Sequence, residues 1–338
     1  MKKLNINLPT TLAFILIVGL SGCRKQEQIK IGFLYSSDVT VRFYKESHFF
    51  KEHAEALGAQ VILDHANDND ALQYDKAIEM MDQDIDLLAL IAVNVNTAEN
   101  IVKEAKARGI PVLAYNRLIS NCDLDVYISG NNEQLGKDMA GYVVEQRPQG
   151  NYIILGGDRF DRNAVELMAS IEKTLKPHIE SGNINILYKT YIENWNPDHA
   201  AYELDQVLAA YPQSIEAVIA CFDGMAVSCI EVLKKYNLDG KVIVTGQDAQ
   251  LESCRRIVEG TQHITLYHPL KDIAYKAAEV AIDIINRVKL EKKYNITYVN
   301  NGFEDVPTVQ INSIPVTKEN IDDVLIKSGF YKQEEIYQ

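Results

Sequence analysis

The residues with the clearest capacity for chemistry are polar side chains that directly follow short apolar runs. In the segment 241–269, the β-branched run Val242–Val244 is followed by Gln247 and Asp248. Such a run is typical of a buried parallel strand, and ligands of open α/β sheets bind at the carboxyl ends of the strands. Asp248 is therefore the first candidate for a ligand contact. The alternative is that Asp248 only caps a helix predicted over 249–259.

Side chains of similar chemical kinds follow most of the other predicted strands. Arginine, aspartate and asparagine offer paired donors and acceptors that suit neighbouring hydroxyl groups, and an aromatic face can cover the C–H face of a sugar ring. Their recurrence at one predicted sheet edge, rather than any single residue, indicates a binding site. The candidates are Arg42, Phe43, Asn116, Arg117, Asp161, Asn163, Trp195, Phe222, Asp248 and His268.

The sequence shows no pattern typical of a nucleophilic enzyme, a bound phosphate or a metal site. The pair Gly156-Gly157 lacks the GxGxxG spacing, and neither GxxxxGK[ST] nor GxSxG occurs. The acidic tract 64–70 resembles a calcium loop but lacks the required glycine and glutamate. We expect this tract to end a strand and to cap the helix 71–81, and we predict no cofactor.

Short apolar strands and amphipathic helices alternate along the chain and would carry these residues. Helix 97–108 is an example, because its apolar residues share one face and Gly109 ends it before the next strand. This alternation predicts parallel sheets with right-handed crossovers. The predicted strands are 29–35, 60–63, 87–93, 111–115, 126–129, 152–156, 184–191, 217–221, 242–246 and 264–267.

Ten strands are too many for one compact layer, so we predict two α/β domains. The architecture expected is two Rossmann-like parallel-sheet lobes joined by three hinge strands. The crossings between lobes are expected at 130–132, 267–269 and 298–302. The N-terminal lobe would then comprise 29–130 and 268–298, and the C-terminal lobe 131–267 and 299–330.

The amino terminus predicts export and attachment to lipid. Two lysines precede the apolar run Leu12–Leu20, which is too short to span a bilayer but suits a signal peptide of residues 1–22. The following Cys23 ends a Leu-Ser-Gly-Cys sequence that resembles a bacterial lipobox. We therefore expect Cys23 to be lipidated and to be the only membrane anchor. An ordinary secretory signal with a chance cysteine is the alternative.

Charge and cysteine content restrict the partners further. The formal net charge of the chain is -13, which makes nucleic acid and anionic lipid poor partners. No CxxC pair or histidine cluster accompanies the remaining cysteines, so buried free thiols are expected rather than a metal or redox site. These cysteines are Cys122, Cys221, Cys229 and Cys254.

Dispersed segments over nearly the whole mature chain resemble the periplasmic sugar-binding proteins of ABC transporters. The likeness is to the ribose-binding-type clamshell and, within it, to the D-xylose-binding branch. The segments that carry it are Leu113–Arg117, Tyr127–Ser129, Pro148–Tyr152, Gly246–Ala249, Arg256-Ile257, Gly260–Gln262, Tyr267, Pro269, Asn300–Gly302 and Asp305–Pro307. The resemblance implies a type I periplasmic binding protein fold, a monomer without a catalytic role, and sugar contacts from Arg42, Arg117, Asp161, Asn163, Trp195 and Asp248.

Four of the candidates depart from the pattern of that branch. Phe43 stands where the xylose proteins have Trp, and Asn116 replaces an Asp. Phe222 replaces an Asn and so removes a polar partner, and His268 replaces a Lys with a ring that is neutral at pH 7. These departures predict a ligand preference that has moved away from xylose.

Together, these patterns predict a lipid-anchored periplasmic protein that captures a xylose-like pentose or related sugar and delivers it to an ABC permease. One alternative is a sensor subunit that presents its sugar-bound form to a membrane receptor kinase. A transcription repressor on the same core would need a basic DNA-binding unit before the first strand, where only 23–28 lie. An enzyme is the remaining alternative, with Asp161, Asp248 and His268 as acid and base.

Overall fold

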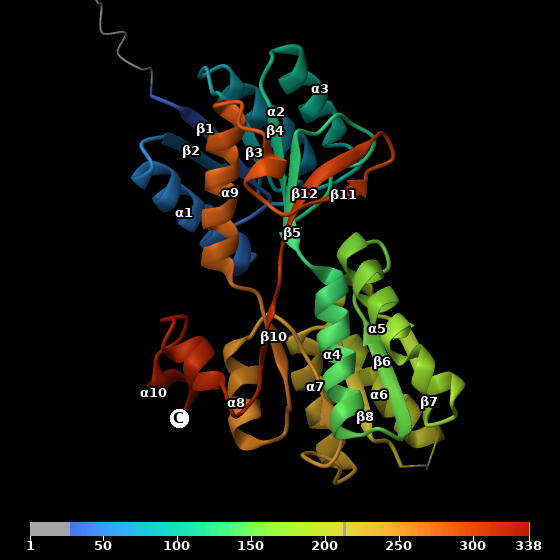
Figure 1. Cartoon of the computed structure of the whole chain (residues 1–338). Coiled ribbons are helices and arrows are strands. Elements are labelled where there is room, and N and C mark those ends of the chain that lie inside the picture. Colours follow the sequence, from blue (N-terminus) through green and yellow to red (C-terminus); the bar gives the residue numbers. More distant parts are fainter. Residues whose placement is uncertain (1–27, 212–213, 338) are drawn as a thin grey trace, which may run out of the picture.

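The computed structural model describes residues 28–211 and 214–337, and it has two lobes joined by three connecting segments (Figure 1). The predicted signal peptide and Cys23 lie outside the described residues. Within the described ranges, no helix is long and apolar enough to cross a bilayer. The two-lobed α/β architecture agrees with the sequence-based prediction.

The N-terminal lobe is built on a seven-stranded sheet with the order β11-β12-β5-β4-β3-β1-β2. Neighbouring strands are parallel except for the antiparallel pair β11 and β12. The strands are β1 (Lys30–Tyr35), β2 (Gln60–His65), β3 (Leu87–Leu90), β4 (Val112–Tyr115), β5 (Val126–Gly130), β11 (Ile296–Asn300) and β12 (Asp305–Ile311). The main helices are α1 (Val41–Ala56), α2 (Asp70–Met81), α3 (Glu99–Ala107) and α9 (Leu270–Ile285), with a short 3₁₀ turn at Leu290–Lys292.

Two separate hydrophobic clusters cover the two faces of this sheet. Helices α1 and α9 contribute to one cluster, and α2 and α3 contribute to the other. Strands β3 and β4 are buried along their whole length, as expected for apolar strands covered on both faces. The side chain of Asn69 caps α2 by accepting a hydrogen bond from the Leu72 amide at 2.9 Å, so the acidic tract caps a helix as predicted.

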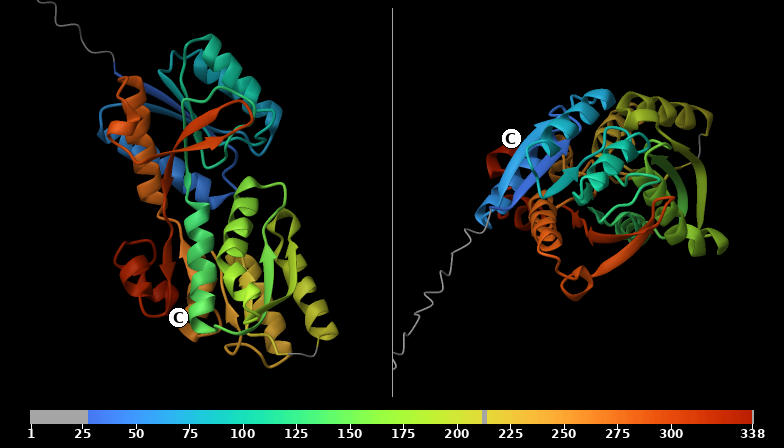
Figure 2. Two further views of the ribbon diagram at one scale, coloured as in Figure 1. Left: turned by 45° about the vertical axis from the view of Figure 1, so that its right-hand side comes forward. Right: turned by 90° about the horizontal axis from the view of Figure 1, so that it is seen from above.

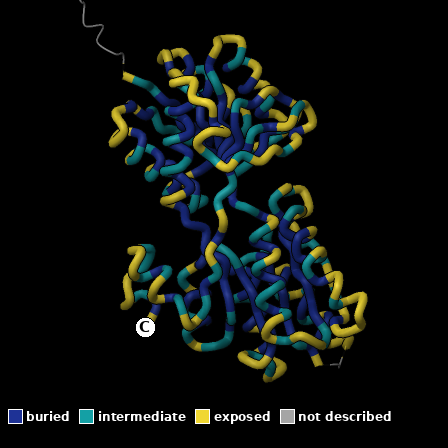
Figure 3. The backbone as a smooth tube through the Cα atoms, viewed as in Figure 1, coloured by how far each residue is buried: buried dark blue, intermediate teal, exposed yellow. Residues whose placement is uncertain are grey.

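A four-stranded parallel sheet with the order β7-β6-β8-β9 forms the core of the C-terminal lobe. Its strands are β6 (Gly150–Gly156), β7 (Ile184–Tyr191), β8 (Ala217–Ala220) and β9 (Ile243–Val244), and the separate antiparallel pair is β10 (Thr265–Tyr267) with β13 (Ile314–Val316). The helices are α4 (Asn132–Gln146), α5 (Arg162–Glu180), η1 (Glu193–Trp195), α6 (Pro197–Ala210), α7 (Asp223–Lys235), α8 (Leu251–Glu259), a π-helical turn at Asp322–Ile326 and α10 (Gln333–Ile336). Figure 3 shows the buried backbone at the centre of each lobe, surrounded by more exposed outer helices. The four predicted free cysteines are buried within these cores and carry free thiols.

The third crossing between the lobes lies later in the chain than predicted. Strand β11 turns back into β12, and β12 pairs in parallel with β5 of the N-terminal sheet. Val306 and Val309 of β12 are buried in the two clusters of that lobe. Residues 299–311 therefore belong to the N-terminal lobe, and the predicted assignment of 299–330 as a whole to the C-terminal lobe is wrong. The chain crosses at 312–313, between β12 and β13.

The three connecting segments run side by side between the lobes (Figure 2). The amide of Asn131 donates to the Ile311 carbonyl at 2.9 Å, and the Asn131 side chain donates to Asn312 Oδ1 at 2.9 Å. The remaining segment, 268–269, continues from β10, which pairs with β13. A narrow bundle of connections of this kind allows the two lobes to rotate about one common axis.

Candidate ligand-binding site

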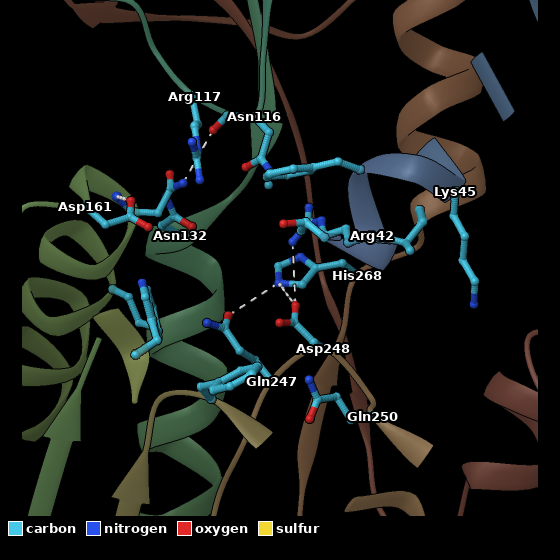
Figure 4. A pocket seen from close by; sticks show the side chains of 18 of the residues that line it. Arg42, Lys45, Asn116, Arg117, Asn132, Asp161, Gln247, Asp248, Gln250 and His268 are labelled. Atoms are coloured by element: carbon cyan, nitrogen blue, oxygen red, sulfur yellow. Dashed lines mark hydrogen bonds and ion pairs between the residues drawn. The ribbon is translucent and has the colours of Figure 1, made fainter. Parts of the chain in front are cut away.

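A cavity of about 510 Å³ lies between the two lobes beside the connecting segments. All ten residues that the sequence identified as candidates line this cavity. Figure 4 shows the side chains of several of them pointing into it. From the N-terminal lobe come Arg42, Phe43, Asn116 and Arg117; from the C-terminal lobe come Asp161, Asn163, Trp195, Phe222 and Asp248; and His268 comes from a connecting segment.

Strand direction explains this convergence. Asn116 directly follows β4, and one residue separates Phe222 from the end of β8. Asp248 lies in the loop that follows β9. Because the strands within each sheet are parallel, their carboxyl ends lie at one edge, and the residues that follow them gather there. The carboxyl edges of both sheets border the same cavity, so residues far apart in sequence face each other.

The centre of the cavity holds a charged cluster that spans the lobes. Arg42 Nη1 lies 3.6 Å from Asp248 Oδ1, although the two residues belong to different lobes. Arg42 Nε lies 3.3 Å from Glu46 Oε1, one turn further along α1. His268 Nε2 lies 3.6 Å from the same Asp248 oxygen and 3.3 Å from Gln247 Oε1 (Figure 4). Arg42 is thus held between two carboxylates, one from each lobe.

Burial shifts the protonation of this cluster. Loss of solvent raises the pKa of Glu46 to about 6, although the neighbouring Arg42 guanidinium opposes the shift. Burial also raises the pKa of Asp248, again against the effect of Arg42. For His268, burial and then the charge of Arg42 lower the pKa well below its ordinary value. His268 is therefore neutral at pH 7, as predicted, and presents one donor and one acceptor.

Asp248 does not serve as a helix cap. The N-cap residue of α8 is Gln250, and no side chain caps that helix. Asp248 and Ala249 instead adopt left-handed backbone conformations, with φ of 90° and 48°. The loop is fixed by the buried Asp223, which accepts a hydrogen bond from the Gln250 amide at 2.7 Å, and by Thr265 Oγ1, which accepts one from the Ala249 amide at 3.2 Å. These contacts aim the Asp248 carboxylate into the cavity.

Arg117 is held by its own lobe. Its Nη1 donates to the Ala92 carbonyl at 3.0 Å and lies 3.3 Å from the Val93 carbonyl. The guanidinium also lies over the ring of Phe43, at 5.3 Å from the ring centre. Phe43 is only 6% exposed. The ring therefore supports Arg117 and offers less free aromatic surface than the sequence suggested.

Trp195 and Phe222 form an apolar corner on the opposite side of the cavity. Their ring centres are 6.3 Å apart and the rings meet edge to face. The indole occupies space that only a glycine leaves free, because a Cβ at Gly157 would lie 2.2 Å from Trp195 Cη2. Asn194 and Trp195 have left-handed φ values of 54° and 53°, which turn the indole out of the 3₁₀ segment.

Asp161 and Asn163 lie at the start of α5 and have structural contacts of their own. Asp161 caps the helix, since its Oδ1 accepts a hydrogen bond from the Asn163 amide at 2.9 Å. Asn163 Oδ1 accepts a hydrogen bond from Asn132 at 2.9 Å, and its Nδ2 lies 3.4 Å from the Asn116 carbonyl of the other lobe. One oxygen of Asp161 therefore supports the helix, and the other is left for a ligand.

Several lining residues were not among the sequence candidates. Gln247 directly follows a predicted strand, and Asn132 ends the polar tract 130–132 that follows another, so the same strand-end signal could have identified them. Lys45, Phe330 and Tyr331 also line the cavity, but they come from the second turn of α1 and from the C-terminal segment. No local sequence pattern connects these three residues with a strand end.

The family model described as a periplasmic binding protein domain matches residues 32–289. The chain belongs to this family. It is 38% identical over 336 residues to the D-xylose-binding periplasmic protein of Escherichia coli (strain K12), covering 99% of this chain and 100% of that protein. It is 36% identical over 329 residues to the D-xylose-binding periplasmic protein of Haemophilus influenzae, covering 96% and 98%.

A solved structure shows the same fold. The ABC transporter solute binding protein from Clostridium phytofermentans with bound β-D-glucose matches with a TM-score of 0.79 and 21% identity, covering 91% of this chain and 99% of that one. The predicted type I periplasmic binding protein fold is thereby confirmed. The cavity described above is the cleft between the two lobes of this periplasmic binding protein.

Proposed function

We propose that this periplasmic binding protein captures a monosaccharide, a xylose-like pentose or a related sugar, and delivers it to the membrane permease of an ABC transporter. The observation that carries the proposal is that charged hydrogen-bond donors and charged acceptors reach one cavity from different lobes. Arg42 and Arg117 supply donors from one lobe, while Asp161 and Asp248 supply acceptors from the other. A sugar presents hydroxyl groups that pair with both kinds of group and a C–H face that packs on Trp195.

Closure of the lobes would be the functional event, with no chemical step. A ligand that contacts both lobes binds the closed arrangement more tightly and therefore shifts the population toward it. The permease would recognise that closed form. The D-xylose-binding relatives, which match almost the whole chain, support this assignment.

The apolar corner predicts which sugars fit. Phe222 cannot form a hydrogen bond, so a hydroxyl directed at its ring would be buried without a partner, at a cost of about 1–3 kcal/mol. The preferred ligand should present an apolar edge to Phe222 and Trp195. D-xylose itself should bind more weakly than such a sugar or polyol.

The proposal includes attachment to a membrane through lipid on Cys23 and a location in the periplasm. The Leu-Ser-Gly-Cys sequence after an apolar run supports it. Changing Cys23→Ser should move the protein from the membrane fraction to the soluble fraction. If the variant remains in the membrane fraction after a high-salt wash, the anchor lies elsewhere.

A calorimetric and thermal-shift screen over pentoses, hexoses, inositols and polyols tests the binding function. At a sugar concentration of about 100 times Kd, binding adds about 2.7 kcal/mol to the free energy of unfolding and raises Tm by several degrees. We expect at least one monosaccharide to do so with a stoichiometry of one. Absence of binding across the whole panel would contradict the proposed function.

A further inference from the structure

The C-terminal segment after β13 packs on the outside of α8 in the C-terminal lobe (Figure 1). Leu325 and Ile336 share a hydrophobic cluster with Cys254 and Ile257 of α8. The Arg255 side chain also donates to the Glu335 carbonyl at 2.9 Å. The segment is thus a fixed part of this lobe.

Two aromatic residues of this segment reach the ligand cavity. Tyr331 donates from its hydroxyl to the Ala249 carbonyl at 3.0 Å, directly beside Asp248. The Phe330 ring packs against Tyr331 at 4.6 Å and against Tyr267, at the end of β10, at 4.7 Å between ring centres. The segment therefore contacts both the loop that presents Asp248 and one of the connecting strands.

One contact of this segment crosses to the other lobe. Lys45 Nζ, on α1 of the N-terminal lobe, lies 5.1 Å from the centre of the Phe330 ring. Within the described residues, Lys45 has no ion-pair partner, so its charge is directed at the ring rather than at a carboxylate. Lys45 also lies one turn of α1 beyond Arg42, and both line the cavity (Figure 4). A cation over an aromatic face is attractive at this distance.

We propose that the C-terminal segment is an inter-lobe strut that regulates closure of the cleft. The contact of Lys45 with the Phe330 ring joins the two lobes. It stabilises the arrangement in which the lobes lie close together across the cavity. Tyr331 holds the loop of Asp248 in position. Phe330 and Tyr331 are both positioning residues. Their effect on sugar affinity rests on the proposed function, whereas their effect on the inter-lobe distance does not.

The lobe arrangement can be measured without any ligand. Spin labels placed by Lys103→Cys on α3 and Lys176→Cys on α5, in a Cys23→Ser background, would report the distance between the lobes by pulsed electron resonance. The four native cysteines are buried and will react poorly.

Lys45→Met should shift the inter-lobe distances toward longer values. Lys271→Met is the matched control, because Lys271 lies over the Tyr275 ring at 5.2 Å within one lobe. Equal distance distributions for the parent and Lys45→Met would overturn the strut.

The positioning role of Tyr331 is tested by Tyr331→Phe, which removes only the hydroxyl. A looser Asp248 loop should lower the affinity for a sugar from the screen by about fivefold, and the lost hydrogen bond should lower Tm by a few degrees at most. Tyr337→Phe is the control, because it removes the 2.6 Å hydrogen bond to Asp322, which lies within the same segment and outside the cavity lining. Equal affinities for parent and Tyr331→Phe would overturn this role. If the parent binds no sugar, the proposed function fails and the inter-lobe distances alone decide the strut.

Discussion

The two lobes make different contributions to the same cavity. The N-terminal lobe supplies arginines that other groups of that lobe already hold, namely Glu46 for Arg42 and the Ala92 and Val93 carbonyls for Arg117. The C-terminal lobe supplies carboxylates and rings on loops. Among these, Asp248 and Trp195 have left-handed backbone conformations. The charged donors come from one lobe and the charged acceptors from the other, so a ligand contacts both kinds of charged group only when it bridges the two lobes.

The difference also locates the sensitive points of the site. The orientation of the two arginines depends on the groups that hold them, namely Glu46 for Arg42 and the Ala92 and Val93 carbonyls for Arg117. Asp248 and Trp195, whose backbones are left-handed, depend on the residues that pack against their loops. The buried Asp223 accepts a hydrogen bond from the loop of Asp248, and Gly157 leaves the space that the Trp195 indole fills. Substitutions on the two sides should therefore act in different ways.

The largest effect is expected from removing the carboxylate that meets the N-terminal lobe. Asp248→Ala removes the inter-lobe partner of Arg42 and an acceptor for the sugar, and it leaves Arg42 with Glu46 as its one remaining carboxylate partner among the described residues. Sugar affinity should fall by about a hundredfold or more in calorimetric titration. Asp272→Ala, at an exposed position of α9, is the control and should keep parental affinity. A loss below about fivefold for Asp248→Ala would place the sugar elsewhere.

A gain of affinity should follow when the xylose-type residues are restored on both sides. The triple variant Asn116→Asp, Phe222→Asn and His268→Lys adds hydrogen-bonding capacity where the apolar corner and neutral ring now lie. We expect D-xylose affinity to rise by at least about tenfold, since each restored polar partner is worth about 1 kcal/mol. No gain, or sub-micromolar xylose binding by the unmodified protein, would contradict the role assigned to these positions.

A smaller loss should follow from disturbing the support of the indole. Gly157→Ala places a methyl group 2.2 Å from Trp195 Cη2, so the indole has to move away from the cavity wall. We expect sugar affinity to fall by about fivefold, together with a shifted emission of the sole tryptophan. Gly141→Ala in α4 is the matched control, because its Cβ meets no atom within 4 Å. An unchanged affinity for Gly157→Ala would show that Trp195 does not form a wall of the site.

The smallest effect concerns the neutral His268 between the lobes. Its pKa is lowered by burial in the folded protein, whereas the unfolded chain titrates near the ordinary value of about 6.5. Below about pH 6.5, the unfolded state therefore binds the proton first, and the contribution of His268 makes the free energy of unfolding fall with falling pH. Glu46, with its pKa raised to about 6, acts in the opposite direction. Relative to the parent, His268→Gln should therefore lose less free energy of unfolding, or gain more, between pH 7 and 6 in denaturant titrations. An identical pH dependence for the two proteins would contradict a neutral buried ring.

The sequence predicted the residues that line the cavity better than it predicted the boundaries of the lobes. Strand-end residues such as Asn116 and Asp248 could be recognised because an apolar run, a strand end and a polar residue are adjacent in sequence. The position of β12 could not, because its pairing with β5 joins segments nearly two hundred residues apart and depends on tertiary packing. The same reason explains why Phe330 and Lys45 were missed.

The central claim is that one sugar contacts both lobes, and a reporter on one lobe with a substitution on the other tests it directly. Trp195 is the only tryptophan and lies in the C-terminal lobe, whereas Arg42 lies in the N-terminal lobe. Titration of the unmodified protein with a sugar from the screen should change the Trp195 fluorescence in a saturable way. In Arg42→Met, the same change should require at least about a hundredfold more sugar, because a charged hydrogen-bond donor is lost. An identical titration curve for both proteins, or no fluorescence change despite binding confirmed by calorimetry, would contradict a sugar bound between the lobes.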